Sequence, residues 1–168
     1  MDRAELQALQ KPLKEQYREE PSSALITLRA DGKLDEEKIA CKVDTGRALV
    51  EAGLHPATGG TGAFACSGDM LLEALAACAG VTLRSVATSM ELAVTGTVHA
   101  EGDLDFRGTL GVDREASVGF TAIRLRFELE SGAGEEELEK LMERTERYCV
   151  VGQTLVGGVP LEFSYSSS

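Results

Sequence analysis

A long segment in the middle of the chain, from Asp69 to about Met90, constrains the fold more than any other feature. Nearly every position in it is apolar or small, although Glu73 and Arg84 interrupt it. A helix that is apolar nearly all round is a buried one, and at 1.5 Å per residue this one would be roughly 33 Å long. We therefore expect a central helix wrapped by sheet or by another subunit. Ser67 is placed to cap it, and Asp69 suits its first turn, where the helix dipole favours anions.

The segments on both sides of this helix carry strand patterns, in which apolar and polar residues alternate. The predicted strands cover residues 24–33, 38–44, 47–54, 93–105, 117–130 and 159–166. We expect the first of them to run into a turn at Asp31 and Gly32. Residues 134–149 have the spacing of an amphipathic helix. This order of elements predicts an α+β fold, an antiparallel sheet with helices on one face.

The N-terminus differs from the rest of the chain. Residues 1–22 are highly charged and predict a helical extension with leucines on one face, which Pro12 would kink or divide. Residues 23–168 show no internal repeat and no linker, so we expect them to form a single domain.

The charge of the chain excludes some classes of partner. With 28 acidic and 17 basic side chains the net charge is −11, whereas phosphate binding needs clustered lysine and arginine. We therefore expect no nucleic-acid partner. The N-terminus lacks a signal-peptide core, and no stretch reaches the eighteen or so uncharged apolar residues of a membrane span. A cytoplasmic protein with no membrane partner is expected.

The four cysteines are the candidate reactive groups. Without a C-x-x-C pair, and with two histidines in the chain, we expect neither a disulfide scaffold nor a metal site. Cys41 lies on the apolar face of a predicted strand, and Cys66 precedes the helix in a glycine-rich loop, so both are interpreted as structural. Cys78 has small neighbours that leave room for a ligand, and Cys149 lies on the core-facing stripe of its helix. Nothing in the sequence pattern shows that these two meet, so plain core and redox pair both remain open.

Two separate motifs, around Cys78 and Cys149, resemble the OsmC/Ohr family of peroxide-handling proteins. They are "CSGDMLLEALAACAGVTLRSVA", and "ERYCVVGQTL" followed by "VPLEFSY". The resemblance extends from about Leu25 to the C-terminus. It implies an intertwined homodimer with the two central helices buried between the subunits. It also implies thiol-dependent reduction of organic hydroperoxides, with an external dithiol as reductant and no cofactor.

The resemblance assigns roles to the two cysteines. Cys78 would be the peroxidatic thiol, which attacks the peroxide as a thiolate and becomes a sulfenic acid. Cys149 would be the resolving thiol, which condenses with that acid to a disulfide. Many members of the family place proline directly after the second cysteine, whereas Val150 follows here. The chain therefore resembles a less-characterised branch.

A buried thiol needs help to ionise, because desolvation raises its pKa. By the resemblance, an arginine from the early strands supplies that help, held by an acidic residue near the start of the central helix. Arg29 is the first candidate for this arginine and Arg47 the alternative. Where better-known members carry glutamate this chain has Gly68, followed by Asp69, which would orient the arginine or simply serve the first helical turn.

Three functions fit these observations. The first is a dithiol peroxidase acting through Cys78 and Cys149. The second is a non-catalytic dimer that binds a small apolar ligand, and the third is a thiol redox sensor. An arginine beside Cys78 would favour the first.

Overall fold

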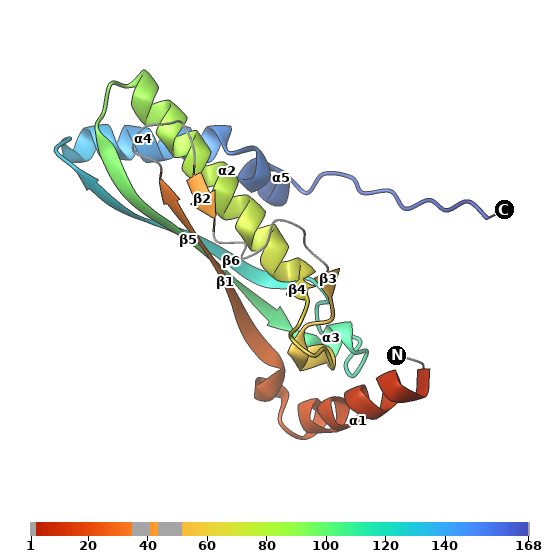
Figure 1. Ribbon diagram of the computed structural model, residues 1–168. Coiled ribbons are helices and arrows are strands. Elements are labelled where there is room, and N and C mark those ends of the chain that lie inside the picture. The colour runs from red at the N-terminus through yellow and green to blue at the C-terminus, as the bar shows by residue number, and fades with distance from the viewer. Residues whose placement is uncertain (1–2, 35–40, 44–51, 168) are drawn as a thin grey trace.

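The computed structural model describes residues 3–34, 41–43 and 52–167, with only the backbone described for residues 3–7, 28–34 and 41–43 (Figure 1). The helices are α1 (Arg3–Glu19), α2 (Ser67–Ser89), α3 (Phe106–Thr109), α4 (Glu135–Tyr148) and α5 (Val150–Gly157), with 3₁₀ turns η1 (Pro21–Ala24) and η2 (Pro56–Thr58). The strands are β1 (Leu25–Leu34), β2 (Cys41–Val43), β3 (Ala52–Gly53), β4 (Ala65–Cys66), β5 (Val94–Asp105) and β6 (Phe120–Ser131).

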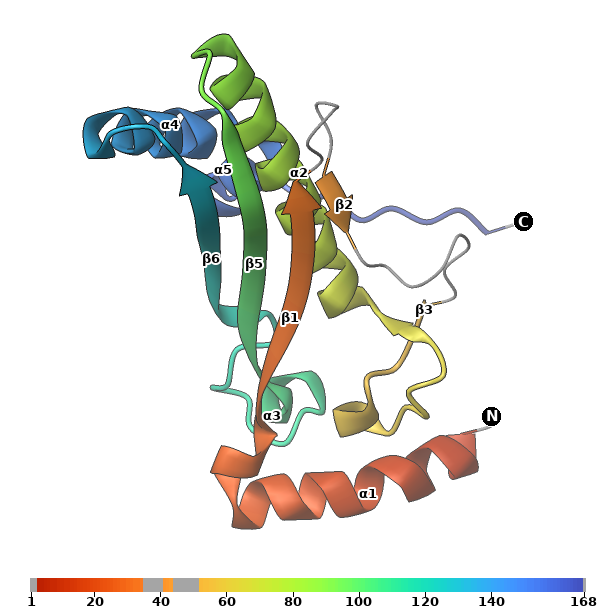
Figure 2. The ribbon, with the colours of Figure 1, turned by 60° about the vertical axis from the view of Figure 1, so that its left-hand side comes forward.

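An antiparallel sheet forms one layer of the protein, in the order β2-β1-β5-β6. The short strands β3 and β4 pair in parallel apart from it. Helices α2, α4 and α5 lie on one face of the sheet, and α1 lies across its end (Figure 2). This arrangement confirms the predicted α+β class.

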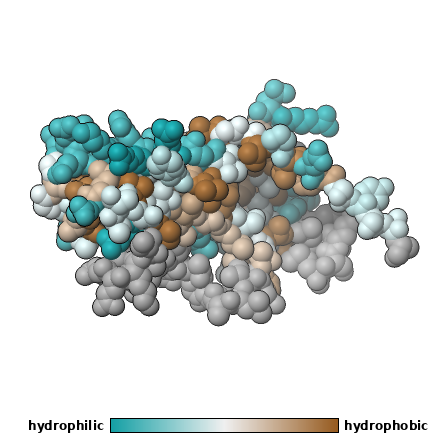
Figure 3. Space-filling model, turned by 90° about the horizontal axis from the view of Figure 1, so that it is seen from above, coloured by the Kyte–Doolittle hydropathy of each residue, from teal (hydrophilic) through white to brown (hydrophobic). Residues whose placement is uncertain are grey.

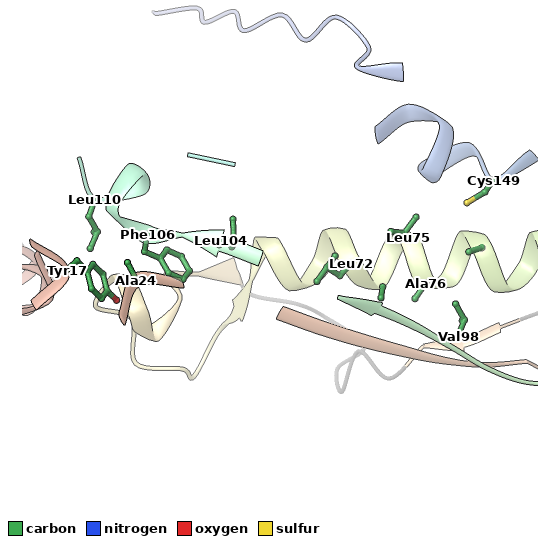
Figure 4. Packing of buried hydrophobic residues seen from close by; sticks show 12 residues of the cluster. Tyr17, Ala24, Leu72, Leu75, Ala76, Val98, Leu104, Phe106, Leu110 and Cys149 are labelled. Atoms are coloured by element: carbon green, nitrogen blue, oxygen red, sulfur yellow. The ribbon is translucent and has the colours of Figure 1, made fainter. Parts of the chain in front are cut away.

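The core forms where α2 packs on the middle of the sheet (Figure 4). Ala76 and Ala79 of α2 are fully buried, as are Val98 and Ala100 of β5. Small side chains on both elements let the helix lie close to the strands, and such close packing gains dispersion energy from many short contacts. At the other end of α2, Arg84 Nη1 donates a hydrogen bond of 2.8 Å to the carbonyl of Val94.

The face of α2 that points away from the sheet remains open. Met70, Ala74, Val81 and Ser85 follow one another along it and are exposed. The single chain therefore does not bury α2 on all sides. The sheet, α4 and α5 cover its other faces and leave this one exposed. By length and composition α2 is the one described helix that could cross a membrane, a property it shares with core helices of soluble proteins.

The start of α2 also differs from its prediction. The N-cap position belongs to Cys66, whose side chain makes no capping hydrogen bond, and Ser67 is the first helical residue. Ser67 is therefore not the cap. Asp69 lies in the first turn, as expected.

The predicted turn at Asp31 and Gly32 is wrong. β1 continues through both residues to Leu34, with Asp31 opposite His99 and Gly32 opposite Val98 on β5. The local preference of an Asp-Gly pair for a turn is outweighed here by the backbone hydrogen bonds of an uninterrupted strand pair.

Helix α1 runs unbroken through Pro12, so the predicted division of the helix does not occur. Besides its contacts with η1 and α3, α1 is held by two side-chain hydrogen bonds to η2. Tyr17 is 3% exposed and its hydroxyl donates a hydrogen bond of 2.7 Å to the carbonyl of Ala57, while Gln10 Nε2 donates one of 3.2 Å to the carbonyl of Thr58.

The predicted strands agree unevenly with the observed ones. β5 and β6 confirm the two after the central helix, whereas only β2 and β3 are described within residues 38–44 and 47–54. Helices α3 and α5 were not expected. Residues 159–166 form no strand: they are extended, and the segment projects away from the body of the protein (Figure 1). A strand needs a neighbour for its backbone hydrogen bonds, and the described part of this chain places none beside it.

Asp105 connects the end of β5 to the short helix α3. It is 6% exposed, and its carboxylate accepts hydrogen bonds from the backbone N–H of Arg107 at 3.0 Å and from the guanidinium Nη2 of Arg107 at 2.5 Å. These bonds hold the pKa of Asp105 below its ordinary value, against the opposing effect of burial.

We predict that Asp105→Asn lowers the free energy of unfolding by about 1–3 kcal/mol at pH 7, the usual cost of losing a charged hydrogen-bond partner. Because the folded pKa of Asp105 lies below the unfolded value of about 3.9, its contribution is present above that pH and is lost as the pH falls through the folded pKa. Urea unfolding at pH 7 and pH 3 measures this. Asp113→Asn, at a more exposed partner of Arg107, should cost less. An equal cost for Asp105→Asn at both pH values would contradict the prediction.

Candidate functional site

Cys149 lies at the junction of α4 and α5. Its backbone N–H donates a hydrogen bond of 3.0 Å to the carbonyl of Thr145, and its own carbonyl accepts one of 2.8 Å from the N–H of Gln153. Its sulfur accepts a hydrogen bond of 3.4 Å from the N–H of Gly152, which caps the start of α5. The thiol is thus fixed by both helices, and the residue is 3% exposed.

The structure brings Cys78 and Cys149 together. Cys78 is half-buried on α2, which contacts both α4 and α5. Burial raises the pKa of the Cys149 thiol, and a hydrogen bond with the Cys78 side chain and the charge of Cys78 raise it further. Backbone hydrogen bonds from the N–H groups of Gly152 and Val151 lower the pKa of Cys149, but they do not outweigh the effect of burial. Both cysteines are free thiols.

Glycine at position 152 leaves room for the Cys149 side chain beside it. A Cβ added there would lie 3.2 Å from the Cys149 sulfur and 3.8 Å from Leu75 Cδ1 of α2. A residue with a side chain here would therefore require the sulfur to shift by a few tenths of an ångström. Figure 4 shows Cys149 beside α2, near Leu75.

An open groove of about 1110 Å³ passes the Cys149 thiol. Its apolar floor is formed by Ile123, Leu125 and Phe127 of β6, whose alternation directs these side chains toward the helices. Its walls come from α4 and α5, including Met142 and Val156. Such a groove can hold the hydrocarbon part of a small molecule next to the sulfur.

Asp69 does not contact the two thiols. It lies nine residues before Cys78 on the same helix, about 13 Å along the axis. Burial raises the pKa of its carboxyl, and the nearby His55 partly offsets this. His55 in turn stacks on Phe106 with ring centroids 5.0 Å apart. Asp69 can act on Cys78 only through a long side chain that spans this distance.

The two arginine candidates differ in what is known of them. The backbone of Arg29 pairs with Glu101 in the β1–β5 ladder, and only the backbone of this residue is described. Arg47 lies outside the described residues altogether. The activating arginine therefore stays a prediction.

The other two cysteines lie elsewhere. Cys66 is half-buried at the start of α2, twelve residues and about 18 Å along the helix from Cys78. Cys41 is in β2, with only its backbone described. Among the described residues, no three histidine, cysteine or acidic side chains meet as metal ligands would.

Sequence reasoning missed the residues that form the groove. These are the glutamates on one flank of α4 and the residues of α5, Gly152, Gln153 and Val156. The spacing of glutamates in "GEEELEKLMERTERYC" was a visible signal, since residues four apart share a helix face. The role of α5 had no such signal, because residues 150–157 show no polar and apolar faces.

A family model described as "OsmC-like protein" matches residues 60–164, which is more than half of the chain. The chain belongs to the OsmC-like family. The match includes α2 and both cysteines of the pair.

A solved structure agrees with this assignment. The crystal structure of an OsmC-like hydroperoxide resistance protein from Jannaschia sp. CCS1 is similar in fold, with a TM-score of 0.54 and 17% sequence identity. The match covers 83% of this chain and 91% of that one. A comparison with curated proteins finds no match. The predicted OsmC-like fold, with its antiparallel sheet and long central helix, is confirmed.

The contact between the two thiols generates a prediction. Because Cys78 raises the pKa of Cys149, the variant Cys78→Ala should titrate Cys149 at a lower pH than the wild type does. The pH dependence of iodoacetamide alkylation, followed by mass spectrometry of the Cys149 peptide, measures this. Cys66→Ala is the control and should leave the value unchanged. An unchanged Cys149 pKa in Cys78→Ala would show that the thiols do not interact.

Proposed function

We propose that this OsmC-like protein is a thiol-dependent peroxidase that reduces organic hydroperoxides. The observation that supports it most is that Cys78 and Cys149, from segments far apart in the sequence, lie close enough to interact. Of the two, Cys149 lines the apolar groove. The described hydroperoxide resistance protein of similar fold is consistent with this. A protein that only bound an apolar ligand would need the groove but not the pair of thiols.

The proposed reaction has three steps. The thiolate of Cys78 attacks the terminal, hydrogen-bearing oxygen of the hydroperoxide, the O–O bond breaks, and the leaving alkoxide takes a proton to become an alcohol. The resulting sulfenic acid condenses with the Cys149 thiol, forming a disulfide and releasing water. An external dithiol then reduces the disulfide by exchange and is itself oxidised.

The environments of the two sulfurs support this division of roles. Burial and the neighbouring Cys78 keep Cys149 protonated at neutral pH, and a thiol is a poor nucleophile toward peroxide. Cys78 is half-buried and so more accessible to a substrate than Cys149 is. Because Cys78 packs against the cluster that contains Cys149, Cys149 would be placed to capture the sulfenic acid before a second peroxide oxidises it further. Arg29, oriented by Asp69, is the proposed activating group, with Arg47 as the alternative.

The peroxidase proposal predicts loss of turnover in Cys78→Ser. With cumene hydroperoxide and dithiothreitol, alcohol formation by this variant should fall to the uncatalysed rate. With excess peroxide and no dithiothreitol, Cys149→Ser should instead complete one turnover and then accumulate sulfinic acid at Cys78, visible by intact mass. Peptide mapping of oxidised wild type should give a disulfide between Cys78 and Cys149.

Two results would overturn the proposal. Equal turnover by wild type and Cys78→Ser would exclude Cys78 as the peroxidatic residue. A disulfide that forms without steady turnover would favour a redox sensor instead.

We further propose that the working unit is a homodimer. The open face of α2 exposes Met70, Ala74 and Val81, and the C-terminal segment exposes Leu161 and Phe163 at 77% and 91%. Alternating apolar residues in an extended segment are typical of a strand. This segment can pair as a strand if a second copy of the chain supplies the neighbouring strand. Apolar surface of this kind on both elements supports an intertwined arrangement.

Deleting residues 159–168 should therefore reduce dimerisation. Light scattering after size exclusion should give twice the chain mass for the wild type and one chain mass for the deletion, at concentrations near 10 µM. Deleting only Ser166–Ser168 is the control and should leave the dimer intact. A deletion of residues 159–168 that stays fully dimeric would contradict the role given to this segment.

A further inference from the structure

The groove beside Cys149 has a marked distribution of charge. Four of its lining residues are glutamates of α4: Glu135, Glu139, Glu143 and Glu146. Their spacing places them along one flank of the helix, and all are exposed. None of the described residues that line the groove is a lysine or an arginine.

The basic residues of β6 and Lys140 of α4 do not line the groove. On β6, Arg124 and Arg126 alternate with the floor residues and so point to the opposite face of the sheet. Arg124 pairs there with Asp103 at 2.6 Å. On α4, Lys140 pairs with Glu136, which does not line the groove, at 2.6 Å. Figure 3 shows hydrophilic side chains along one border of the molecule, with hydrophobic ones beside them.

A row of like charges along a groove with an apolar floor produces a negative potential inside it. The low-dielectric floor screens this potential less than water would. A ligand that carries a carboxylate meets repulsion along the groove, whereas an uncharged ligand of the same shape does not. The charge of the whole chain, −11, acts in the same direction.

We propose that this acidic flank makes the groove beside Cys149 selective for uncharged organic hydroperoxides and against those that carry a carboxylate. The inference rests on the proposed peroxidase function. It adds Glu139 and Glu143, in the middle of the flank, as specificity-determining residues. The hydrocarbon part of a ligand packs on the apolar floor, and an anionic group on that ligand is repelled by the glutamates.

The test compares a hydroperoxide that carries a carboxylate, 4-(2-hydroperoxypropan-2-yl)benzoate, with its uncharged methyl ester. At low ionic strength the wild type should have a kcat/KM for the ester about tenfold or more above that for the carboxylate. Glu139→Gln/Glu143→Gln should lower this ratio about threefold or more, and 0.5 M salt should lower the wild-type ratio as well. Glu115→Gln/Glu130→Gln removes the same charge outside the groove and is the matched control. Its ratio should remain that of the wild type.

A binding readout separates this inference from the peroxidase proposal. The alcohols that correspond to the two hydroperoxides cannot react, and their binding is measured by how well each protects Cys149 from alkylation. The ester alcohol should protect at about tenfold or more lower concentration than the carboxylate alcohol, and Glu139→Gln/Glu143→Gln should narrow the difference. Selective protection without turnover would sustain the charge selectivity and reject the peroxidase. Equal kcat/KM values for the ester and the carboxylate, or equal protection of Cys149 by their two alcohols, would overturn the proposed selectivity if seen in wild type and variants alike.

Discussion

The packing of α2 on the sheet is the contact on which the rest of the structure depends. Alanines on the helix meet Val98 and Ala100 of β5, and the small side chains bring the helix close to the strands. This position of α2 decides where Cys78 lies. It also forms one wall against which α4 and α5 pack, and so decides where Cys149 lies. A larger residue at Ala76 or Ala79 would displace the helix and separate the two thiols without touching either.

The sequence predicted best those features that are set by local pattern. The alternation in β6 and the apolar run of α2 each require one neighbouring surface, and both elements appear within a few residues of the expected bounds. Features set by distant contacts were predicted less well. The pair Asp31-Gly32 favours a turn locally, yet nine backbone pairings with β5 keep it in a strand. Residues 159–166 alternate as a strand does, but an alternating pattern does not provide the neighbour.

The site shows the same division. Burial of Cys149 followed from its place on the apolar stripe of its helix, whereas its meeting with Cys78 depends on how α4 ends and α5 begins. That junction has an extended backbone at Cys149, with φ −70° and ψ 100°, which no local pattern announced. Resemblance to the OsmC/Ohr family connected the two cysteines because it carries the geometry of a whole fold. The resemblance assigned no role to the glutamates of α4, which are exposed on the surface of this chain.

The place of Cys149 between two helices has a mechanical consequence. A bond formed at its sulfur would tie the central helix to the C-terminal pair and close a loop of chain that includes β5, α3, β6 and α4. Closing a loop of that length removes conformational freedom from the unfolded chain worth about 4 kcal/mol in the chain-entropy model. The oxidised protein would then resist heat and proteases better than the reduced one.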